Sequence, residues 1–204
     1  GNKMNNVKKG GAVLIIMDAQ NMILDEKGSA AAFGIWKHAR KNKTVENVKK
    51  TIEKARRADV PIIYIQTFIR PEILPETGFW KDVRNIKEKL SVSEFEHQFK
   101  IVEELKPHSE DYVVKKWNCM DAFHNTELDA LLKGLKRDTI IFAGVATNFC
   151  VETTVRSASD RGYNIIVLSD CVATMNEEIQ SFPINVIFPM LGEVTTADKL
   201  EITS

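Results

Sequence analysis

Four side chains with reactive chemistry stand at or just beyond the ends of apolar segments in this 204-residue chain. Asp18 ends the first such segment, Lys115 and Lys116 end a later one, and Cys150 follows another. If these segments are parallel strands, their carboxyl ends meet at the edge of the sheet where ligands usually bind. A thiol, a carboxylate and an ammonium group at one edge could together perform nucleophilic catalysis.

Cys150 is the most suggestive of the four. It lies between the apolar run "IIFAG" and an amphipathic segment, which places it in the first turn of a predicted helix. Free backbone N–H groups and the helix dipole favour an anion there, so the position predicts a lowered thiol pKa and donors for an oxyanion. Asp18 could accept the thiol proton, and Lys116 could stabilise the thiolate. A structural interpretation stays open, in which Cys150 fills the core, Asp18 caps a strand and Lys116 is a solvated charge.

The other two cysteines, Cys119 and Cys171, give no indication of a disulfide or a zinc site, because the total of three is odd and no CxxC spacing occurs. Cys171 follows the last long strand-like run but lacks a matching motif, so packing is the simpler interpretation. Free cysteines are typical of a reducing compartment, and a cytoplasmic location is therefore expected.

The composition limits the kinds of partner. Hydrophobic residues make up 44 % and charged residues 27 % of the chain, as in ordinary globular proteins. Lys plus Arg and Asp plus Glu both number 28, so no net charge favours nucleic acid or an anionic membrane. No apolar run approaches the roughly 20 residues of a membrane span. A small molecule is the expected partner, and the length fits a single domain over residues 1–204.

Strand-like and helix-like segments alternate along the chain. Continuous apolar runs predict buried strands at 12–18, 62–68, 111–116, 138–144 and 163–170. Helical patterns predict helices at 44–59, with Thr44 as the cap, at 125–135, after Cys150 and, interrupted by proline, within 177–196. This order predicts an α/β fold, a single-domain parallel β-sheet with helices on both faces. Residues 19–43 look irregular, and residues 70–107 are expected to form a lid or wall.

Three blocks of sequence resemble one known superfamily. "GVATNFCVETTVRSASDRGY" resembles the nucleophile motif of the isochorismatase-like cysteine hydrolases, "LIIMDAQNMIL" resembles their first strand with its acid, and "VVKKWNCMDAFHNTELDALL" resembles their lysine strand and following helix. With "LGEVTTAD", these blocks run in the family's order over nearly the whole chain. The resemblance implies a Rossmann-like three-layer αβα fold and a catalytic triad of Cys150, Asp18 and Lys116.

The resemblance also implies details of the nucleophile turn. A non-proline cis peptide is expected between Val145 and Ala146, and the backbone N–H groups of Ala146 and Cys150 are expected to form the oxyanion hole. The lysine register departs from the family, since Phe123 follows Lys116 by seven positions instead of the usual six. Lys116 is preferred, with Lys115 as the alternative.

The expected pocket wall also differs from the family pattern, because Asp121 and Ala122 stand where the family usually has Ser-Ala.

The branch of the superfamily can be narrowed from residue types. The nicotinamidases of the superfamily that this chain resembles carry a set of histidines that binds a metal ion. This chain has no histidine between His38 and His97, so neither a metal nor a cofactor is expected. True isochorismatases lack the cysteine nucleophile. The motif most resembles the ureidoacrylate and N-carbamoyl amidohydrolase branch, which implies hydrolysis of a small amide or ureido C–N bond through a Cys150 thioester. Resembling proteins are usually homo-oligomers.

Weaker candidates and other functions stay open. Gln20, Trp117 and Thr147 could contact substrate, although Gln20 could equally stabilise a turn, tryptophan is more often a core residue, and Thr147 could support the nucleophile turn. The alternatives in function are another hydrolase of the family, including an isochorismatase-type enzyme, or a non-catalytic or redox-sensing α/β domain. A redox sensor needs a resolving thiol near Cys150, and ammonia release during turnover would separate the two possibilities.

Overall fold

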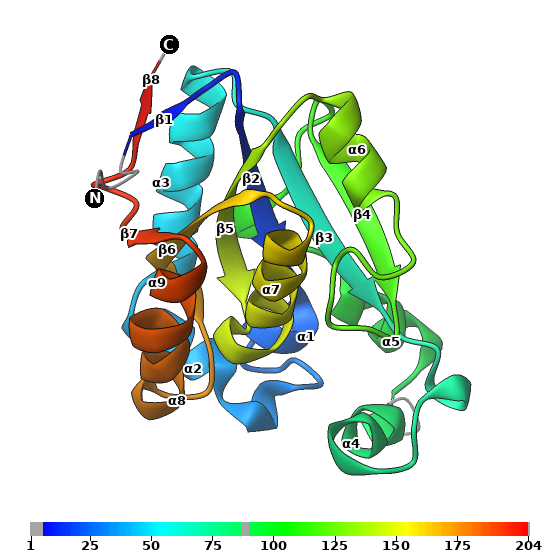
Figure 1. The fold of residues 1–204 in the computed structure, drawn as a ribbon. Helices are drawn as coiled ribbons and strands as arrows, with labels where there is room; N and C mark the ends of the chain where they lie inside the picture. The colour runs from blue at the N-terminus through cyan, green and yellow to red at the C-terminus, as the bar shows by residue number, and fades with distance from the viewer. Residues whose placement is uncertain (1–5, 87–89, 204) are drawn as a thin grey trace.

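The computed structural model describes residues 6–86 and 90–203. Its centre is a six-stranded, fully parallel sheet (Figure 1). The strand order is β4 (Tyr112–Trp117), β3 (Ile62–Phe68), β2 (Ala12–Met17), β5 (Thr139–Val145), β6 (Asn164–Ala173) and β7 (Glu193–Thr195). Met17 pairs with Ile65 on one side and Gly144 on the other, so β2, β3 and β5 reach the same edge of the sheet.

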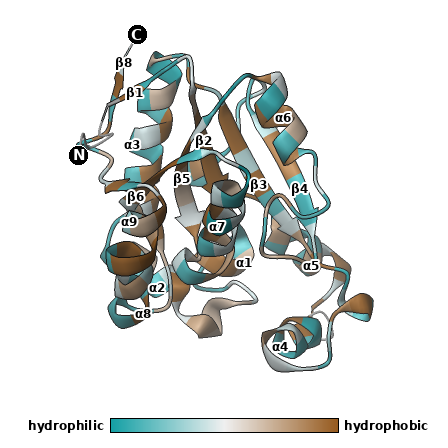
Figure 2. Ribbon diagram, viewed as in Figure 1, coloured by the Kyte–Doolittle hydropathy of each residue, from teal (hydrophilic) through white to brown (hydrophobic). Residues whose placement is uncertain are grey.

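Helices cover both faces of this sheet, as the alternation of side chains in β2 shows. Ala12, Leu14 and Ile16 pack in one core cluster with α3 (Thr44–Arg57), and the residues between them pack in a second cluster with α6 (Leu128–Gly134), α7 (Glu152–Asp160) and α9 (Phe188–Leu191). The central strands are strongly hydrophobic, while the helices mix hydrophobic and polar residues (Figure 2). A strand buried on both faces needs a continuous apolar run. The predicted α/β fold is confirmed.

The segment expected to be irregular contains short helices. They are α1 (Asn21–Leu24), the 3₁₀ turn η1 (Ala31–Phe33) and α2 (Ile35–Lys41). Thr44 begins α3 but does not cap it, because its hydroxyl is buried without a hydrogen-bond partner. Lys43 precedes the helix in the left-handed conformation instead. The prediction of a Thr44 cap is therefore wrong.

The segment 70–107 leaves the sheet between β3 and β4. It contains η2 (Pro71–Ile73), α4 (Gly78–Ile86), α5 (Val92–Phe99) and η4 (Glu103–Leu105). Helix α4 lies at the periphery of the fold, away from the helices that cover the sheet (Figure 1). Across the described ranges, no helix combines the length and the hydrophobicity needed to cross a membrane.

The carboxyl-terminal part follows the predicted proline-interrupted pattern. Helix α8 (Glu177–Phe182) continues through the π-helical turn η6 (Pro183–Ile187) into α9. Two short strands outside the main sheet, β1 (Asn6–Lys8) and β8 (Glu201–Thr203), pair in parallel and bring the two ends of the chain together (Figure 1). The sequence analysis did not predict this small second sheet.

Candidate active site

A buried ion pair stands at the carboxyl end of the central strands. The Lys116 Nζ lies 3.1 Å from Asp18 Oδ2, and both side chains are almost completely inaccessible to solvent. The same ammonium donates hydrogen bonds to the carbonyl oxygens of Cys119, at 3.0 Å, and Met120, at 2.8 Å. Lys116 therefore holds the carboxylate and the loop after β4 in one arrangement. Such a fully buried pair persists only when each charge finds partners.

The alternation of side chains along β4 separates the two candidate lysines. Val114 and Lys116 are buried on one face of this edge strand, whereas Lys115 is exposed on the other. The Lys115 ammonium lies 5.5 Å from the centre of the Phe68 ring. The structure thus brings Lys116, and not Lys115, to Asp18. Neighbouring strand residues point to opposite faces, so only one of two adjacent lysines can reach the site.

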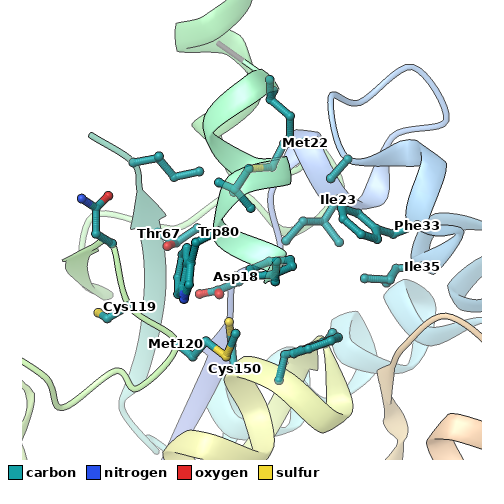
Figure 3. Close-up of a pocket in the computed structure, with 18 of the residues that line it drawn as sticks. Asp18, Met22, Ile23, Phe33, Ile35, Thr67, Trp80, Cys119, Met120 and Cys150 are labelled. Atoms are coloured by element: carbon teal, nitrogen blue, oxygen red, sulfur yellow. The ribbon is translucent and has the colours of Figure 1, made fainter. Parts of the chain in front are cut away.

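Cys150 reaches the same carboxylate from the other side. It lies in the π-helical turn η5 (Thr147–Val151), which continues into α7. The Cys150 side chain borders the same cavity as the Asp18 carboxylate, whose two oxygens have no hydrogen-bond partner among the described residues, and the two side chains face each other in the close-up (Figure 3). The three residues proposed for the triad therefore meet at one place. Cys150 lines the cavity and is partly exposed.

Burial dominates the electrostatics of this cluster. It raises the pKa of the Asp18 carboxyl, and the nearby Lys116 ammonium offsets that shift only in part. Burial, followed by the negative charge of Asp18, also raises the pKa of the Cys150 thiol. For Lys116, burial is the largest single influence and lowers the pKa, but the attractions of Asp18, Cys150 and Cys119 together outweigh it and the pKa is raised. The raised pKa keeps the Cys150 thiol neutral, and the 3.1 Å separation of Lys116 Nζ from Asp18 Oδ2 is the geometry of an ion pair.

The predicted lowering of the Cys150 pKa is wrong for this resting geometry. That prediction considered the dipole at a helix start but not the depth of the site or the charge next to the thiol. A thiol beside a buried carboxylate keeps its proton until that carboxylate accepts it. Ionisation of Cys150 is consequently coupled to protonation of Asp18.

The backbone before Cys150 is unusual at two adjacent places. Gly144 has a φ of 111°, and a Cβ atom there would lie 2.2 Å from the Met17 carbonyl oxygen. Only glycine tolerates both this φ and this close approach of β5 to β2. The next peptide bond, Val145–Ala146, is cis. These features set the path of the chain from β5 into the turn that carries Cys150.

A cavity of about 100 Å³ opens beside Asp18 and Cys150. Its walls come from the ends of β2, β3 and β5, from the loop after β4, and from α1, α2 and α4. Helix α4 contributes Phe79, Trp80 and Val83 to the wall, and the close-up shows the Trp80 ring among the lining side chains (Figure 3). The volume is below the roughly 300–1,000 Å³ of pockets for drug-sized ligands. The site therefore suits a small molecule.

None of the three weaker candidates lines this cavity. Gln20 is fully buried, and its amide bonds to the backbone of Thr67 and Phe99, at 2.8–2.9 Å. Thr147 is also fully buried and donates to Gln180 Oε1 at 2.6 Å. Both residues support the framework, which corrects their assignment to substrate binding.

Trp117 lies on the outer face of β4 and stacks on Phe68, with ring centres 5.0 Å apart. Its assignment to substrate binding is corrected for the same reason, because its ring is on the face of the sheet edge opposite to Lys116.

The two remaining cysteines have different surroundings. Cys119 lines the cavity, and burial raises the pKa of its thiol. Cys171 lies within β6, because this strand extends three residues beyond the predicted end at Asp170. Its completely buried sulfur is 3.5 Å from the Thr51 hydroxyl. The interpretation of Cys171 as a packing residue agrees with this position.

The departure at Asp121 has a structural role. One carboxylate oxygen accepts a hydrogen bond from the Phe123 N–H at 2.9 Å, and the other accepts one from the Ser157 hydroxyl at 2.8 Å. Asp121 thus fixes the loop after β4 to α7, which also carries Thr154, the acceptor for the Ala122 N–H at 3.0 Å. The extra position after Lys116 is accommodated within this loop, whose carbonyls bind the Lys116 ammonium.

Sequence reasoning missed most of the aromatic wall. The rings of Phe33, Phe79, Trp80 and Phe149 all line the cavity. For Phe149 a signal existed, since it directly precedes Cys150 in the turn. For Phe33 there was none, because its segment carries no regular pattern.

In the described part of the chain, the histidine, cysteine and acidic side chains form no group of three suited to a metal ion.

Comparison with known proteins gives consistent matches over nearly the whole chain. A family profile described as the isochorismatase domain matches residues 12–199. The ureidoacrylate amidohydrolase RutB of Agrobacterium fabrum is 27 % identical, covering 94 % of this chain and 89 % of that protein. RutB of Yersinia enterocolitica is 30 % identical, covering 78 % of this chain and 74 % of that protein.

Solved structures agree. A cysteine hydrolase from Pseudomonas syringae is 30 % identical with a TM-score of 0.80, covering 95 % of this chain and 92 % of that one. The N-carbamoylsarcosine amidase of Thermoplasma acidophilum is 25 % identical with a TM-score of 0.68, covering 92 % and 96 % of the two chains.

Proposed function

The chain belongs to the isochorismatase family of hydrolases, and on that premise we propose that it cleaves an amide or ureido C–N bond of a small molecule through a thioester on Cys150. The observation that carries the proposal is the buried Asp18–Lys116 pair, whose carboxylate faces the Cys150 side chain at a small cavity (Figure 3). A carboxylate in that position can serve as the base for a thiol nucleophile.

Acylation begins with proton transfer. Asp18 accepts the thiol proton, and the Cys150 sulfur forms a bond to the carbonyl carbon of the substrate. The raised pKa of the Asp18 carboxyl makes it a stronger base than an exposed aspartate, which favours this transfer. Lys116 stays protonated and stabilises the thiolate while the proton resides on Asp18.

The negative charge then moves to the substrate oxygen. In the proposed mechanism, the backbone N–H groups of Ala146 and Cys150 donate to this oxyanion, and each such donor contributes on the order of 3 kcal/mol to the stability of the transition state. The C–N bond breaks as Asp18 returns its proton to the leaving nitrogen, which departs as ammonia or an amine. An acyl or carbamoyl group is left on Cys150.

Deacylation uses the same groups in the reverse sense. Asp18 removes a proton from water, the hydroxide oxygen bonds to the thioester carbon, and the C–S bond breaks. The proton held by Asp18 returns to the sulfur, and the acid product leaves. Lys116 keeps Asp18 in place through both halves of the cycle, since it is bound on its other sides by two backbone carbonyls.

Three names among the relatives support the choice of reaction. One is a cysteine hydrolase, one is an N-carbamoylsarcosine amidase and others are ureidoacrylate amidohydrolases. All three names describe hydrolysis, and two of them name a carbamoyl or ureido compound.

The test is a screen for ammonia release over simple amides, substituted ureas and N-carbamoyl compounds. The wild-type protein should release ammonia from at least one of these compounds, and Cys150→Ser should lose the activity while remaining folded. Cys171→Ser is the matched control, because its buried sulfur lies outside the cavity. Ammonia release that is undiminished in Cys150→Ser would contradict the proposal.

A further inference from the structure

The cavity beside Cys150 is lined mainly by aromatic and aliphatic side chains. Phe79 stacks on Phe149 with ring centres 5.6 Å apart and an angle of 16° between the ring planes. Trp80 meets Phe79 edge to face at 5.2 Å, and Phe33 lies 5.9 Å from the same ring. These rings connect α4, η1 and the turn η5 into one apolar part of the cavity wall that Asp18 also lines.

The formal charges at the cavity are few. Among the described residues that line it, Asp18 alone carries a charge, and its partner Lys116 is fully buried behind it. The Asn118 side chain is also engaged, since its oxygen accepts from the Arg70 N–H at 2.7 Å and its nitrogen donates to the Arg70 carbonyl at 3.1 Å. The described wall therefore offers no cation to receive an anionic substituent.

We infer that the substrate is a small, uncharged amide or urea whose substituent is apolar, and that the cavity discriminates against substrates carrying a carboxylate. This inference rests on the proposed function and narrows its substrate class. An apolar substituent would contact the rings of Phe79, Trp80 and Phe149 while its carbonyl carbon faces the Cys150 sulfur. Burial of that substituent supplies binding energy in proportion to the apolar area removed from water.

A carboxylate in the same place would be unfavourable for two reasons. It would lose its hydration without gaining a charged or hydrogen-bonded partner on the apolar wall. It would also approach the Asp18 carboxylate, whose like charge the Lys116 ammonium behind it offsets only in part. A penalty of this kind reduces kcat/KM for the charged substrate by at least about 100-fold relative to a neutral substrate of the same shape.

The experiment compares matched pairs of substrates. Succinamate and 4-methylpentanamide have equal numbers of non-hydrogen atoms and differ in a carboxylate against an isopropyl group. The pair 3-ureidopropionate and N-(3-methylbutyl)urea repeats the comparison for ureas. The neutral member of each pair should have the higher kcat/KM, by about 100-fold or more. Equal or better turnover of the charged members would overturn the inference.

A charge introduced into the wall sharpens the comparison. Ile69 lines the cavity just after β3, and Ile69→Arg places a cation there, with Ile69→Gln as the uncharged control. Ile69→Arg should reduce the preference for 4-methylpentanamide over succinamate by at least about tenfold, and Ile69→Gln should not. If a folded Ile69→Arg leaves the preference unchanged, charge is not the basis of selection and the inference fails.

Binding separates this inference from the proposed reaction. Calorimetry on Cys150→Ala with both members of a pair measures selection without turnover, and the neutral member should bind more tightly. Neutral-selective binding without ammonia release by the wild type would sustain the inference on the cavity and contradict the proposed function. Ammonia release by the wild type with a preference for the carboxylate-bearing substrates would support the proposed function and contradict the inference on the cavity.

Discussion

On the sheet side of the cavity, charges and hydrogen bonds hold the side chains, whereas on the α4 side the side chains meet the cavity through ring contacts. Asp18 and Lys116 are fixed by an ion pair and by two backbone carbonyls. Phe79 and Trp80 belong to a peripheral helix and contact Phe33, Phe149 and each other. The first arrangement tolerates little displacement, since it depends on direction and distance. The second is less directional and adapts more easily to different shapes.

This difference suggests a division of labour between the two sides. Substitutions on the sheet side should reduce kcat, because they remove groups that take part in proton transfer or hold those groups in place. Substitutions on the α4 side should mainly raise KM, because they remove apolar surface that contacts the substrate. Each prediction below tests one side against the other.

The largest effect is expected for Asp18→Asn. The amide has nearly the same shape but cannot accept the thiol proton, so kcat/KM should fall by about 10³-fold or more. Steady-state ammonia release measures the loss, and circular dichroism checks the fold. Asp160→Asn is the matched control, because Asp160 is exposed at the end of α7 and should leave kcat/KM unchanged. Retention of more than a tenth of the activity in Asp18→Asn would assign the base to another group.

Removal of the ammonium should destabilise the fold. Lys116→Met leaves the Asp18 carboxylate buried without its ion pair, and the free energy of unfolding should fall by about 3–5 kcal/mol. The double variant Asp18→Asn/Lys116→Met should recover much of that loss, since no charge is then left unpaired.

Lys115→Met, one residue earlier on the exposed face of β4, should change stability by less than about 0.5 kcal/mol. Urea unfolding of the four proteins completes the cycle. If Lys115→Met and Lys116→Met lower the free energy of unfolding by similar amounts, the buried ion pair contributes no more to stability than an exposed lysine does.

The pH profile reports the same pair. Asp18 must be ionised to accept the thiol proton, so activity rises with pH through its pKa, and burial places that acid limb above the ordinary aspartate value of about 3.9. Below the limb, kcat/KM should fall tenfold per pH unit. The limb should move to higher pH in Lys116→Met, because the Lys116 charge lowers the pKa of Asp18. A limb that stays in place in a folded Lys116→Met would contradict this coupling.

The α4 side should give a smaller effect of a different kind. Trp80→Ala removes a ring that lines the cavity, and KM for a neutral amide should rise about tenfold with kcat changed far less. Trp117→Ala is the matched control, since Trp117 does not line the cavity and reaches it only through the Phe68 ring on which it stacks. A fall in kcat without a change in KM for Trp80→Ala would mean that α4 takes part in the chemistry.

The sequence predicted the sheet well for a clear physical reason. A strand such as β2 is buried on both faces and needs an uninterrupted apolar run, which is visible in "AVLIIM". The short helices α1 and α2 were not predicted, because fewer than two or three turns give too little periodicity for a pattern to emerge. The position of Thr44 was recognised as a helix start, but a buried hydroxyl without a partner cannot be read from a sequence.

The site shows the same limit. The strand-end rule located Asp18, Lys116 and Cys150 because parallel strands end at a common edge. It could not place Gln20, whose amide bonds to backbone 47 and 79 positions away. Nor could it give the direction of the Cys150 pKa shift, since burial depends on elements distant in the sequence. The α4 wall was foreseen as a lid or wall, while the rings that line the cavity depend on how α4 packs.

The most direct test of the central claim is the mass of Cys150 during turnover. Wild-type protein is acid-quenched while it hydrolyses a neutral amide or urea, then digested and analysed by mass spectrometry. The peptide containing Cys150 should carry the acyl or carbamoyl mass, the peptides containing Cys119 and Cys171 should not, and Cys150→Ser should show no adduct and no ammonia release. Ammonia release that persists in Cys150→Ser, or an adduct found on Cys119 instead, would contradict the assignment of Cys150 as the nucleophile.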